Sequence, residues 1–530
     1  MPAHRADGRA ARPIAAALAS VVLLGAPVAA ATAAAPAETL APTEVAIIVP
    51  LVAPPRVAGL IPTEELAELT AADGALSRAL DAVQGEQVTL AVDPLIAASI
   101  NALGAEAPPD AIAWVQRLDR TPQDRFLLLT ADADPTLLRQ AGEPLPALGT
   151  VWTSPGTVSM PDVAAFAAAG ASRILVADVD LAGPDGGERP DDAPPVALAA
   201  ADGIGLRVVD TTASAALQAA ADAPSAASLG ALRAEISGDG ERASIIVGLE
   251  RTGDGWSGLD AALDALHSDL GLELVGLDAL DGETVDVAIA DGAQPEDRLE
   301  PFRALVAAEQ ADAAFASIMF DADAFRAERR LRSHALAGVG WASAGAAAGS
   351  AWATAVADAV DASGVLRSGV RIEESDSLFL ADRSSIPISI VNDLDRTITV
   401  VVTARSSNGR LDVDRTPVTV EIAPASRTSV AFGATAVSNG TVAVTARLSA
   451  PDGTPIGQAA LARINVQAGW ETPLTAVAAA VLLLVVVVGI VRTVRRVRRT
   501  RAGATAGSAG PAGEDAGGSP AEAGSEASDD

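Results

Sequence analysis

The feature that most constrains this chain is a charge-free, apolar run near its C-terminus, from Leu474 to Val491. A helix of about 20 such residues spans the hydrocarbon core of a bilayer. Arginines follow at once and predict that this end faces the cytoplasm, because positively charged flanks stay inside. They are Arg492, Arg495, Arg496, Arg498, Arg499 and Arg501. We therefore expect a transmembrane helix over residues 473–491, with Trp470 at its outer interface, rather than the buried helix of a soluble protein.

The N-terminus has the pattern of a secretory signal peptide over residues 1–31. Arginines precede a charge-free run from Ile14 to about Ala31 that closes with small residues. A positive start, an apolar middle and a small-residue end are typical of such peptides. An uncleaved N-terminal anchor is the alternative, and both interpretations export the chain that follows. The predicted location is the cytoplasmic membrane, crossed once, with the N-terminal domain outside.

Charge and composition exclude several classes of function. The formal net charge is −31. Residues 492–530 are expected to form a disordered cytoplasmic tail, because the chain after Arg501 consists of small residues, proline and acids without a large apolar side chain. The six acids of this tail cancel the six arginines. The negative charge therefore belongs to the exported part, which argues against a nucleic-acid partner. The chain has no cysteine, so disulfides, thiol chemistry and sulfur-ligated metals are excluded.

Between residues 45 and 291, short β-branched runs alternate with helical stretches rich in alanine and leucine. Apolar strands that alternate with helices imply parallel βαβ units. The predicted strands are Val45–Val52, Gln87–Asp93, Arg125–Thr130, Thr150–Thr153, Arg173–Asp178, Leu206–Asp210, Ala243–Leu249 and Thr284–Ala290. Their number suggests a TIM-like α/β barrel over residues 40–292. A proline- and acid-rich loop, Pro184–Pro195, interrupts the rhythm, so the barrel is expected to be degenerate.

Two further sequence patterns follow along the chain, one helical and one of alternating strands. Residues 293–368 show apolar positions three and four apart, which predicts a helical connector. Residues 369–468 alternate like β-strands and are punctuated by Asn408-Gly409, Asn439-Gly440 and Asp452-Gly453, the dipeptides of hairpin turns. We expect an immunoglobulin-like β-sandwich there, standing on the membrane helix as a stalk.

The C-terminal third contains distinctive segments: Val391-Asn392-Asp393-Leu394, the run from Ser407 to Leu411, Ile422-Ala423-Pro424, the run from Ala436 to Thr441, the run from Pro451 to Gly457, and the run from Asn465 to Glu471. Together these segments resemble an uncharacterised actinobacterial family of membrane-anchored envelope proteins. The resemblance is specific over about residues 385–490 and looser upstream, where the layout is similar to a degenerate deacetylase-like barrel. Members are typically encoded beside the lipid II flippase. The resemblance thus implies a role near peptidoglycan precursor export, and it carries over no catalytic residue.

Four predicted strands end in carboxylates that could be catalytic, because active sites of parallel barrels lie at these strand ends. The strand-end acids are Asp93, Asp132 with Asp134, Asp178 with Asp180, and Asp210, and the candidates among them are Asp93, Asp134, Asp178 and Asp210. Two carboxylates about 5 to 10 Å apart could hydrolyse a glycoside. The alternative is structural: in Asp93-Pro94 and Asp134-Pro135 an N-cap carboxylate precedes a proline at the first helical position, and Asp210 precedes threonines.

No cofactor or metal is expected. A deacetylase-type barrel holds its metal with an aspartate and two histidines, but His4 lies in the predicted signal peptide, and His267 and His334 lie in segments that look helical. The tryptophans could stack on sugar rings, although core packing is the alternative. They are Trp114, Trp152, Trp256, Trp341 and Trp352.

These observations predict a non-enzymatic accessory factor of the cell envelope for peptidoglycan precursor transport or synthesis. The expected partner is a membrane protein of precursor export or a wall glycan. A carboxylate-dependent hydrolase of the cell wall is the first alternative, and a structural spacer is the second. Whether the chain is an enzyme stays open at the level of sequence.

Overall fold

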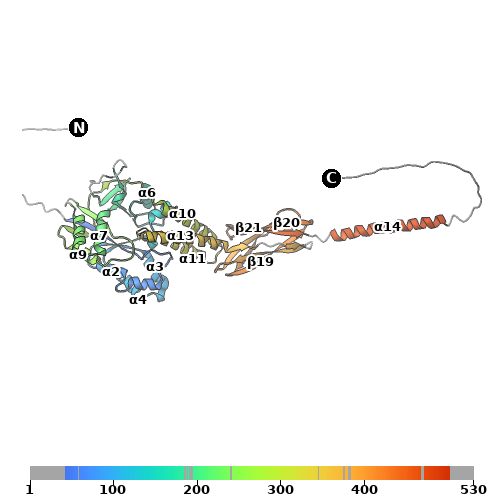
Figure 1. Ribbon diagram of the computed structural model, residues 1–530, viewed down its shortest axis with the longest axis horizontal. Helices are drawn as coiled ribbons and strands as arrows, with labels where there is room; N and C mark the ends of the chain where they lie inside the picture. The colour runs from blue at the N-terminus through green and yellow to red at the C-terminus, as the bar shows by residue number, and fades with distance from the viewer. Residues whose placement is uncertain are drawn as a thin grey trace, which may run out of the picture.

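The computed structural model describes residues 42–501 apart from short gaps at 58, 184–186, 188, 190–194, 239–241, 344, 374–376, 380–382 and 467–470. Three regions follow one another along the long axis of the molecule (Figure 1). A parallel α/β region comes first, then a group of helices, then a pair of mainly antiparallel sheets. A single long helix, α14, continues beyond the sheets. The chain is therefore multidomain, with the α/β region farthest from the C-terminal helix.

The α/β region is organised by seven strands that pair in parallel with their neighbours in chain order. They are β1 (Thr43–Leu51), β2 (Thr89–Val92), β3 (Asp124–Leu127), β4 (Thr150–Trp152), β5 (Arg173–Ala177), β8 (Ile204–Val209) and β9 (Ser244–Gly248). The pairs run β1–β2–β3 and β4–β5–β8–β9, and β9 returns to β1. Within the described residues no ladder joins β3 to β4.

Alternate side chains of these strands enter two different apolar cores. Val45, Ile47 and Val49 of β1 pack with the surrounding helices, whereas Ala46 and Ile48 join a second core shared with β2, β3, β5, β8 and β9. Burial on both faces explains why strands such as β2 and β9 are mainly apolar. The helices of this region are α1 (Thr63–Thr70), α2 (Ala75–Ala82), α3 (Pro94–Leu103), α4 (Pro109–Arg120), α5 (Pro135–Gln140), α6 (Met160–Ala168), α7 (Thr211–Asp222), α8 (Ala226–Ser237) and α9 (Leu259–His267).

The region also contains short strands that the sequence did not reveal. These are β6 (Leu181–Ala182), β7 (Leu198–Ala201) and β10 (Leu272–Val275), with β7 antiparallel to β8. The strand predicted over Thr284–Ala290 is split into β11 (Val285–Asp286) and β12 (Ala288–Ile289), and β12 pairs antiparallel to β6. The sequence pattern did not distinguish β6, β7 and β10 from their surroundings, although β2, β3 and β4, which are similarly short, were recognised.

The helices after residue 295 pack against both neighbouring regions. They are α10 (Glu296–Phe315), α11 (Ala322–Leu336), α12 (Gly340–Ser343) and α13 (Gly345–Ser368). Phe302 of α10 and Leu336 of α11 pack with Leu137 of α5. At the other end, Phe315 and Phe325 belong to the core of the antiparallel sheets. This group therefore joins the two regions through apolar contacts on both sides.

Two sheets enclose one apolar core in the third region. The strands are β13 (Val370–Ile372), β14 (Ser377–Phe379), β15 (Arg383–Asn392), β16 (Ile398–Ser406), β17 (Leu411–Val413), β18 (Val418–Ile422), β19 (Ser426–Ala436), β20 (Gly440–Ser449) and β21 (Pro455–Val466). One sheet has the order β13-β15-β19-β17 and the other β14-β21-β20-β16-β18. All pairs are antiparallel except β14 with β21. Alternating burial along β16 and β20 matches the period of strands with one face inward.

The three turn dipeptides connect strands in different ways. Asp452-Gly453 closes a hairpin between β20 and β21, as the sequence predicts. Asn408-Gly409 lies between β16 and β17, and Asn439-Gly440 lies between β19 and β20, and in both cases the two strands belong to different sheets. The expectation of hairpins was wrong for these two dipeptides. A tight turn reverses the direction of the chain, but it does not determine whether the next strand pairs in the same sheet or in the other one.

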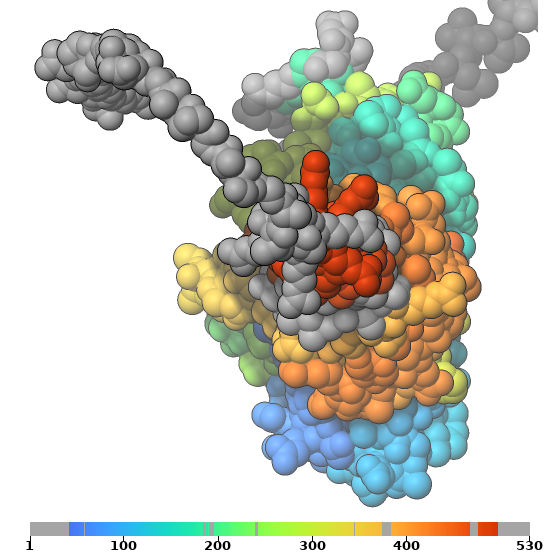
Figure 2. Space-filling view, turned by 90° about the vertical axis from the view of Figure 1, so that its right-hand side faces the viewer, coloured from blue at the N-terminus to red at the C-terminus, as the bar shows by residue number. Residues whose placement is uncertain are grey.

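Helix α14 (Glu471–Arg501) contains a stretch, Thr475–Arg496, that is long and apolar enough to cross a membrane, with a mean hydropathy of 2.7. Its described side chains are exposed, unlike those of a core helix. Figure 2 looks along this helix toward the antiparallel sheets, with the α/β region behind them. Trp470, the predicted signal peptide and the predicted tail beyond Arg501 lie outside the described residues, as do the side chains of Arg498, Arg499 and Arg501.

Candidate functional site

The four candidate carboxylates all lie where parallel strands end, and each binds a helix N-terminus. Asp93 follows β2 and caps α3, with one carboxylate oxygen accepting from the backbone N–H of Leu95 at 2.8 Å. The same oxygen accepts from the N–H of Ala131 at 2.9 Å, beyond the end of β3. Asp93 is 2% exposed. Its role in the fold is thus the capping predicted from Asp93-Pro94.

Asp134 is the most heavily bonded of the four. It caps α5 through the N–H groups of Thr136 and Leu137 and is fully buried. Its other oxygen accepts from Gln294 at 2.8 Å and lies 3.4 Å from the Arg298 guanidinium, so it also ties α10 to the α/β region. Burial raises the pKa of Asp134, but Arg298 and the Thr136 hydroxyl together hold that pKa below its usual range. The carboxylate stays charged and inaccessible.

The remaining two carboxylates serve one helix. Asp210 caps α7 by accepting from the N–H of Ala213 at 2.8 Å and pairs with Arg242 at 3.3 Å. Asp178, at the end of β5, accepts from the N–H and the hydroxyl of Thr211, the first residue of α7. Both are half-buried. Asp178 was not predicted as a cap, because its helix belongs to another βα unit.

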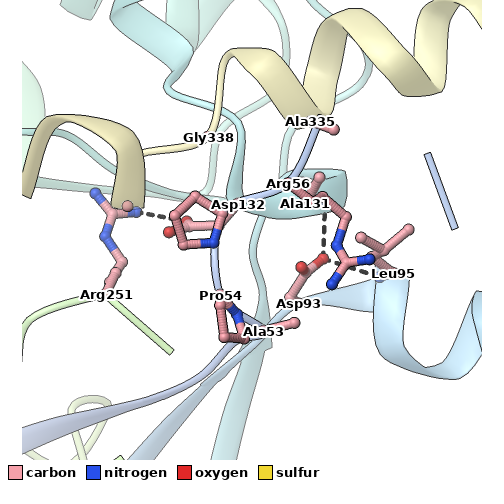
Figure 3. Close-up of a pocket in the computed structure, with 12 residues that line it drawn as sticks. Ala53, Pro54, Arg56, Asp93, Leu95, Ala131, Asp132, Arg251, Ala335 and Gly338 are labelled. Atoms are coloured by element: carbon pink, nitrogen blue, oxygen red, sulfur yellow. Dashed lines mark hydrogen bonds and ion pairs between the residues drawn. The ribbon is translucent and has the colours of Figure 1, made fainter. Parts of the chain in front are cut away.

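A fifth carboxylate, Asp132, is the strongest feature of this strand-end face; the sequence placed it among the strand-end acids but not among the four candidates. It is 5% exposed and pairs with the Arg251 guanidinium at 2.9 Å, so the ends of β3 and β9 are joined by a buried ion pair (Figure 3). Ala131 and Asp132 both have positive φ, 61° and 48°. This conformation is costly for residues other than glycine, and such strain gathers at functional sites.

Asp93 and Asp132 flank a small cavity that also contains Arg56 and the backbone around Gly338 (Figure 3). Its volume is about 10 Å³, the size of one water molecule. Burial raises the pKa of Asp93 to about 7 and that of Asp132 to about 6, and each pKa is raised further by a neighbouring carboxylate. The two acids therefore titrate near neutrality. A sugar ring cannot enter this cavity.

A larger cavity of about 240 Å³ opens next to it, at the ends of β4, β5, β8 and β9. Arg251 lines both cavities. Trp152, at the end of β4, lies against its guanidinium at 4.6 Å from the ring centre. The larger cavity is the part of the strand-end face with room for a small molecule.

The tryptophans separate into two groups. Four are buried, and their indole N–H groups donate to protein oxygens: Trp114 to Leu76, Trp256 to Gln218, Trp341 to Ala335 and Trp352 to Leu336. These four fill the core. Trp152 is only partly buried and lines the larger cavity, so it alone of the five described tryptophans is placed to meet a ligand.

Metal-ligating side chains do not gather on this face. In the part of the chain that the structure describes, no group of three or more His, Cys, Asp or Glu residues is placed to hold a metal ion. His267 and His334 lie on α9 and α11, as their sequence context predicts. Burial lowers the pKa of His334 to about 4. That imidazole is neutral at physiological pH.

Sequence reasoning missed Arg251 and its pairing with Asp132. Asp132 precedes Asp134 by two positions, and only Asp134 has the proline that identifies a cap. Arg251 lies two residues beyond the predicted strand Ala243–Leu249, where a lone arginine in a loop has no distinguishing pattern. A pairing across 119 positions of sequence has no local signature. Only the convergence of parallel strands brings the two together.

The chain has few informative relatives. No curated protein matches its sequence. Among solved structures it is similar to a 4-alpha-glucanotransferase from Thermococcus litoralis, at 13% identity and a TM-score of 0.33 over 51% of this chain and 45% of that one. It is similar to an alpha-mannosidase from Enterococcus faecalis V583 at 10% identity and a TM-score of 0.32 over 78% and 61%.

A further likeness is to WR4, an MSP family member of C. elegans, at 10% identity and a TM-score of 0.15 over 19% of this chain and 98% of that one. The chain spans less than two thirds of either enzyme. Similarities at these scores say nothing specific about function. A family model, by contrast, matches residues 152–522, well over half of the chain, and the protein therefore belongs to the family of unknown function DUF6049.

Proposed function

We propose that this protein is a single-pass component of the cell envelope whose exported part is a non-enzymatic binding or accessory factor for peptidoglycan precursor transport or synthesis. One observation carries the proposal: every candidate carboxylate at the strand ends is engaged in holding the fold together. Asp93, Asp134, Asp178 and Asp210 receive backbone N–H groups at helix starts, and Asp132 pairs with Arg251. A hydrolase needs two accessible carboxyl groups on opposite sides of one bond.

The finer architecture belongs to the same proposal. The return of β9 to β1 and the core shared by six strands support a degenerate barrel, opened between β3 and β4. Two sheets of four and five strands around one core support an immunoglobulin-like sandwich. The arginines after Val491 support a cytoplasmic C-terminus in the cytoplasmic membrane. In this arrangement the sandwich holds the barrel away from the bilayer.

The proposed partner is a membrane protein of peptidoglycan precursor export. Support comes from the resemblance of the C-terminal third to envelope proteins encoded beside the lipid II flippase. The ectodomain is strongly acidic, which disfavours direct docking on anionic lipid or acidic wall polymer. A protein partner in the same membrane avoids that repulsion.

Crosslinking and affinity purification of the full-length chain from its native membrane test the proposal. The control is the same membrane helix and tail behind the signal peptide, without residues 42–466. We expect a precursor flippase or synthase to be enriched with the full chain and lost with the control. Recovery of wall fragments alone, or equal recovery of the synthase with the bare helix, contradicts a protein-binding role of the ectodomain.

A hydrolase of the cell wall is the second candidate, and the raised pKa values of Asp93 and Asp132 favour it. Carboxyl groups that titrate near neutrality suit general acid and base catalysis. Replacing Asp93 and Asp178 by asparagine together distinguishes the two proposals. Loss of a wall-lytic activity without loss of folding supports catalysis, whereas a change in stability alone supports capping.

A further inference from the structure

The larger cavity has the size of a single substituted ring. It measures about 240 Å³, whereas a cavity of about 150 Å³ accommodates benzene. It opens at the ends of four consecutive strands of the parallel ladder, β4, β5, β8 and β9. Binding sites of parallel sheets lie at these ends because the loops there converge without blocking the sheet core. The cavity is therefore in the right place, and of the right size, for one sugar residue.

Most polar side chains of the cavity wall are already bonded inside the protein. The carbonyl oxygen of Gln218 accepts from the N–H of Glu250 at 3.0 Å and from the Trp256 indole at 3.2 Å. The hydroxyl of Ser214 donates to the Asp210 carbonyl and accepts from the N–H of Gly248. These contacts hold the wall in one shape. The Gln218 carbonyl oxygen and the Ser214 hydroxyl are therefore not available to bond a ligand.

Three polar groups of the wall keep hydrogen-bonding capacity. In the part of the chain that the structure describes, no bond occupies the exposed carboxylate of Glu250 or the hydroxyl of Ser343. Arg251 is 6% exposed, yet its hydrogen bond to Asp132 uses only Nη1. An arginine has five N–H donors. The wall thus offers an acceptor, buried donors and a hydroxyl.

Trp152 gives the cavity an aromatic wall that is fixed in position. A side-chain carbon on Gly248 would lie 2.6 Å from Cζ2 of the indole, so the ring approaches the backbone of β9 where only glycine fits. The Arg251 guanidinium lies 4.6 Å from the ring centre and restrains it further. An indole held in this way loses little freedom when a ligand packs on it. Its apolar face suits the C–H face of a pyranose.

Charge selects among ring-shaped ligands. The positive charge of Arg251 is matched by Asp132 at 2.9 Å, so Glu250 leaves the cavity with one net negative charge. The whole chain carries −31. Phosphorylated or carboxylated sugars are repelled by both. A neutral sugar is not, and its hydroxyls donate to a carboxylate while they accept from a guanidinium.

We propose that the cavity beside Trp152 binds one ring of a neutral saccharide, packed on the indole and hydrogen-bonded to Glu250 and Arg251. Binding of this kind needs neither catalysis by the candidate carboxylates nor the protein partner proposed above. It goes beyond the accessory role, because a protein partner can be found without sugar binding and sugar binding can be found without a protein partner.

Saturation-transfer NMR on the full-length protein in lipid nanodiscs tests this, because detergents with sugar headgroups would compete. The probes are N-acetylglucosamine and glucose, with glucuronic acid as the charged comparator. Glu250→Gln removes the free carboxylate charge from an exposed position. Its matched control is Glu283→Gln, another exposed glutamate, remote in sequence from the cavity-lining residues. Equal melting temperatures of the three proteins establish that folding is unchanged.

We expect saturable transfer from at least one neutral sugar, weaker transfer from glucuronic acid, and a dissociation constant raised about tenfold or more by Glu250→Gln, since a hydrogen bond to a charged group is lost. Glu283→Gln should bind as the original chain does. Absence of saturation up to the solubility of both neutral sugars overturns the proposal. So does unchanged binding by Glu250→Gln, or preference for glucuronic acid.

Discussion

Replacing Asp134 by asparagine should destabilise the α/β region far more than the loss of a helix cap. The introduced amide would keep the shape of the side chain and an oxygen for the N–H groups of α5. The negative charge would be gone, however, and the Arg298 guanidinium would stay buried without it. Gln294 also donates to this carboxylate at 2.8 Å and would face an amide instead.

The magnitude follows from the burial of the pair. Removing one partner of a buried ion pair costs about 3–5 kcal/mol, because the remaining charge is desolvated without compensation. A loss of 1 kcal/mol lowers the melting temperature of a domain of about 250 residues by roughly 2–4 °C. We therefore expect a decrease of roughly 10 °C. Asp210→Asn is the matched control, since its cap and its arginine are half-buried, and should cost only about 1 kcal/mol.

Differential scanning calorimetry of the full-length protein measures both variants. The pKa of Asp134 lies below its usual range in the folded state, so the stabilisation by its charge is present above about pH 4 and lost as pH falls further. The difference between the original chain and Asp134→Asn should narrow at that acidic end. Adding Arg298→Met should recover much of the loss, because no buried charge remains. A decrease no larger than that of Asp210→Asn would refute the reasoning.

Other perturbations test separate parts of the structure. The original chain should lose roughly a few kcal/mol of stability as pH rises from about 4 through the raised pKa of Asp93, about 7, and Asp93→Asn should remove this loss. Melting temperatures of both proteins between pH 5 and pH 8 test this, and the same dependence of melting temperature on pH in both would contradict it. Gly248→Ala should displace the Trp152 indole and cost about 1–3 kcal/mol, visible as altered tryptophan fluorescence; an unchanged spectrum would deny the close approach. Asn392→Ala should leave buried backbone carbonyls unpaired and cost about 1–3 kcal/mol, measured as faster proteolysis between residues 383 and 466; an unchanged cleavage rate would show that these bonds are dispensable.

The caps show how far local sequence reaches. Asp93-Pro94 and Asp134-Pro135 predict helix starts because a carboxylate and a proline satisfy the first helical turn on their own, and both start helices here. The capping role of Asp178 could not be predicted in this way, since Asp178 caps α7 from the neighbouring βα unit. Several of the seven parallel strands were recognisable because they are apolar on both faces, as β1, β2 and β9 are. Short antiparallel additions such as β7 have no such pattern.

The candidate site was likewise predicted from local sequence only in part. Its carboxylates were found from their positions at strand ends, but their use in the fold depends on partners far away in sequence, such as Gln294 and Arg298 for Asp134. Arg251 was missed, and so was its pairing with the strand-end acid Asp132, although the two form the buried pair next to the cavities. Trp152 was one of several equivalent tryptophans until the other four proved to be buried.

The sequence by itself determined the features that arise from local composition: an apolar helix long enough for a membrane, alternating strands and helices, and carboxylates that begin helices. Bilayer thickness, strand periodicity and capping are set by a few consecutive residues. Only the tertiary structure decided which charges pair, which sheet receives a strand after a turn, and which tryptophan faces a cavity. These outcomes depend on contacts between distant segments, because parallel strands bring their ends together whatever their separation along the chain.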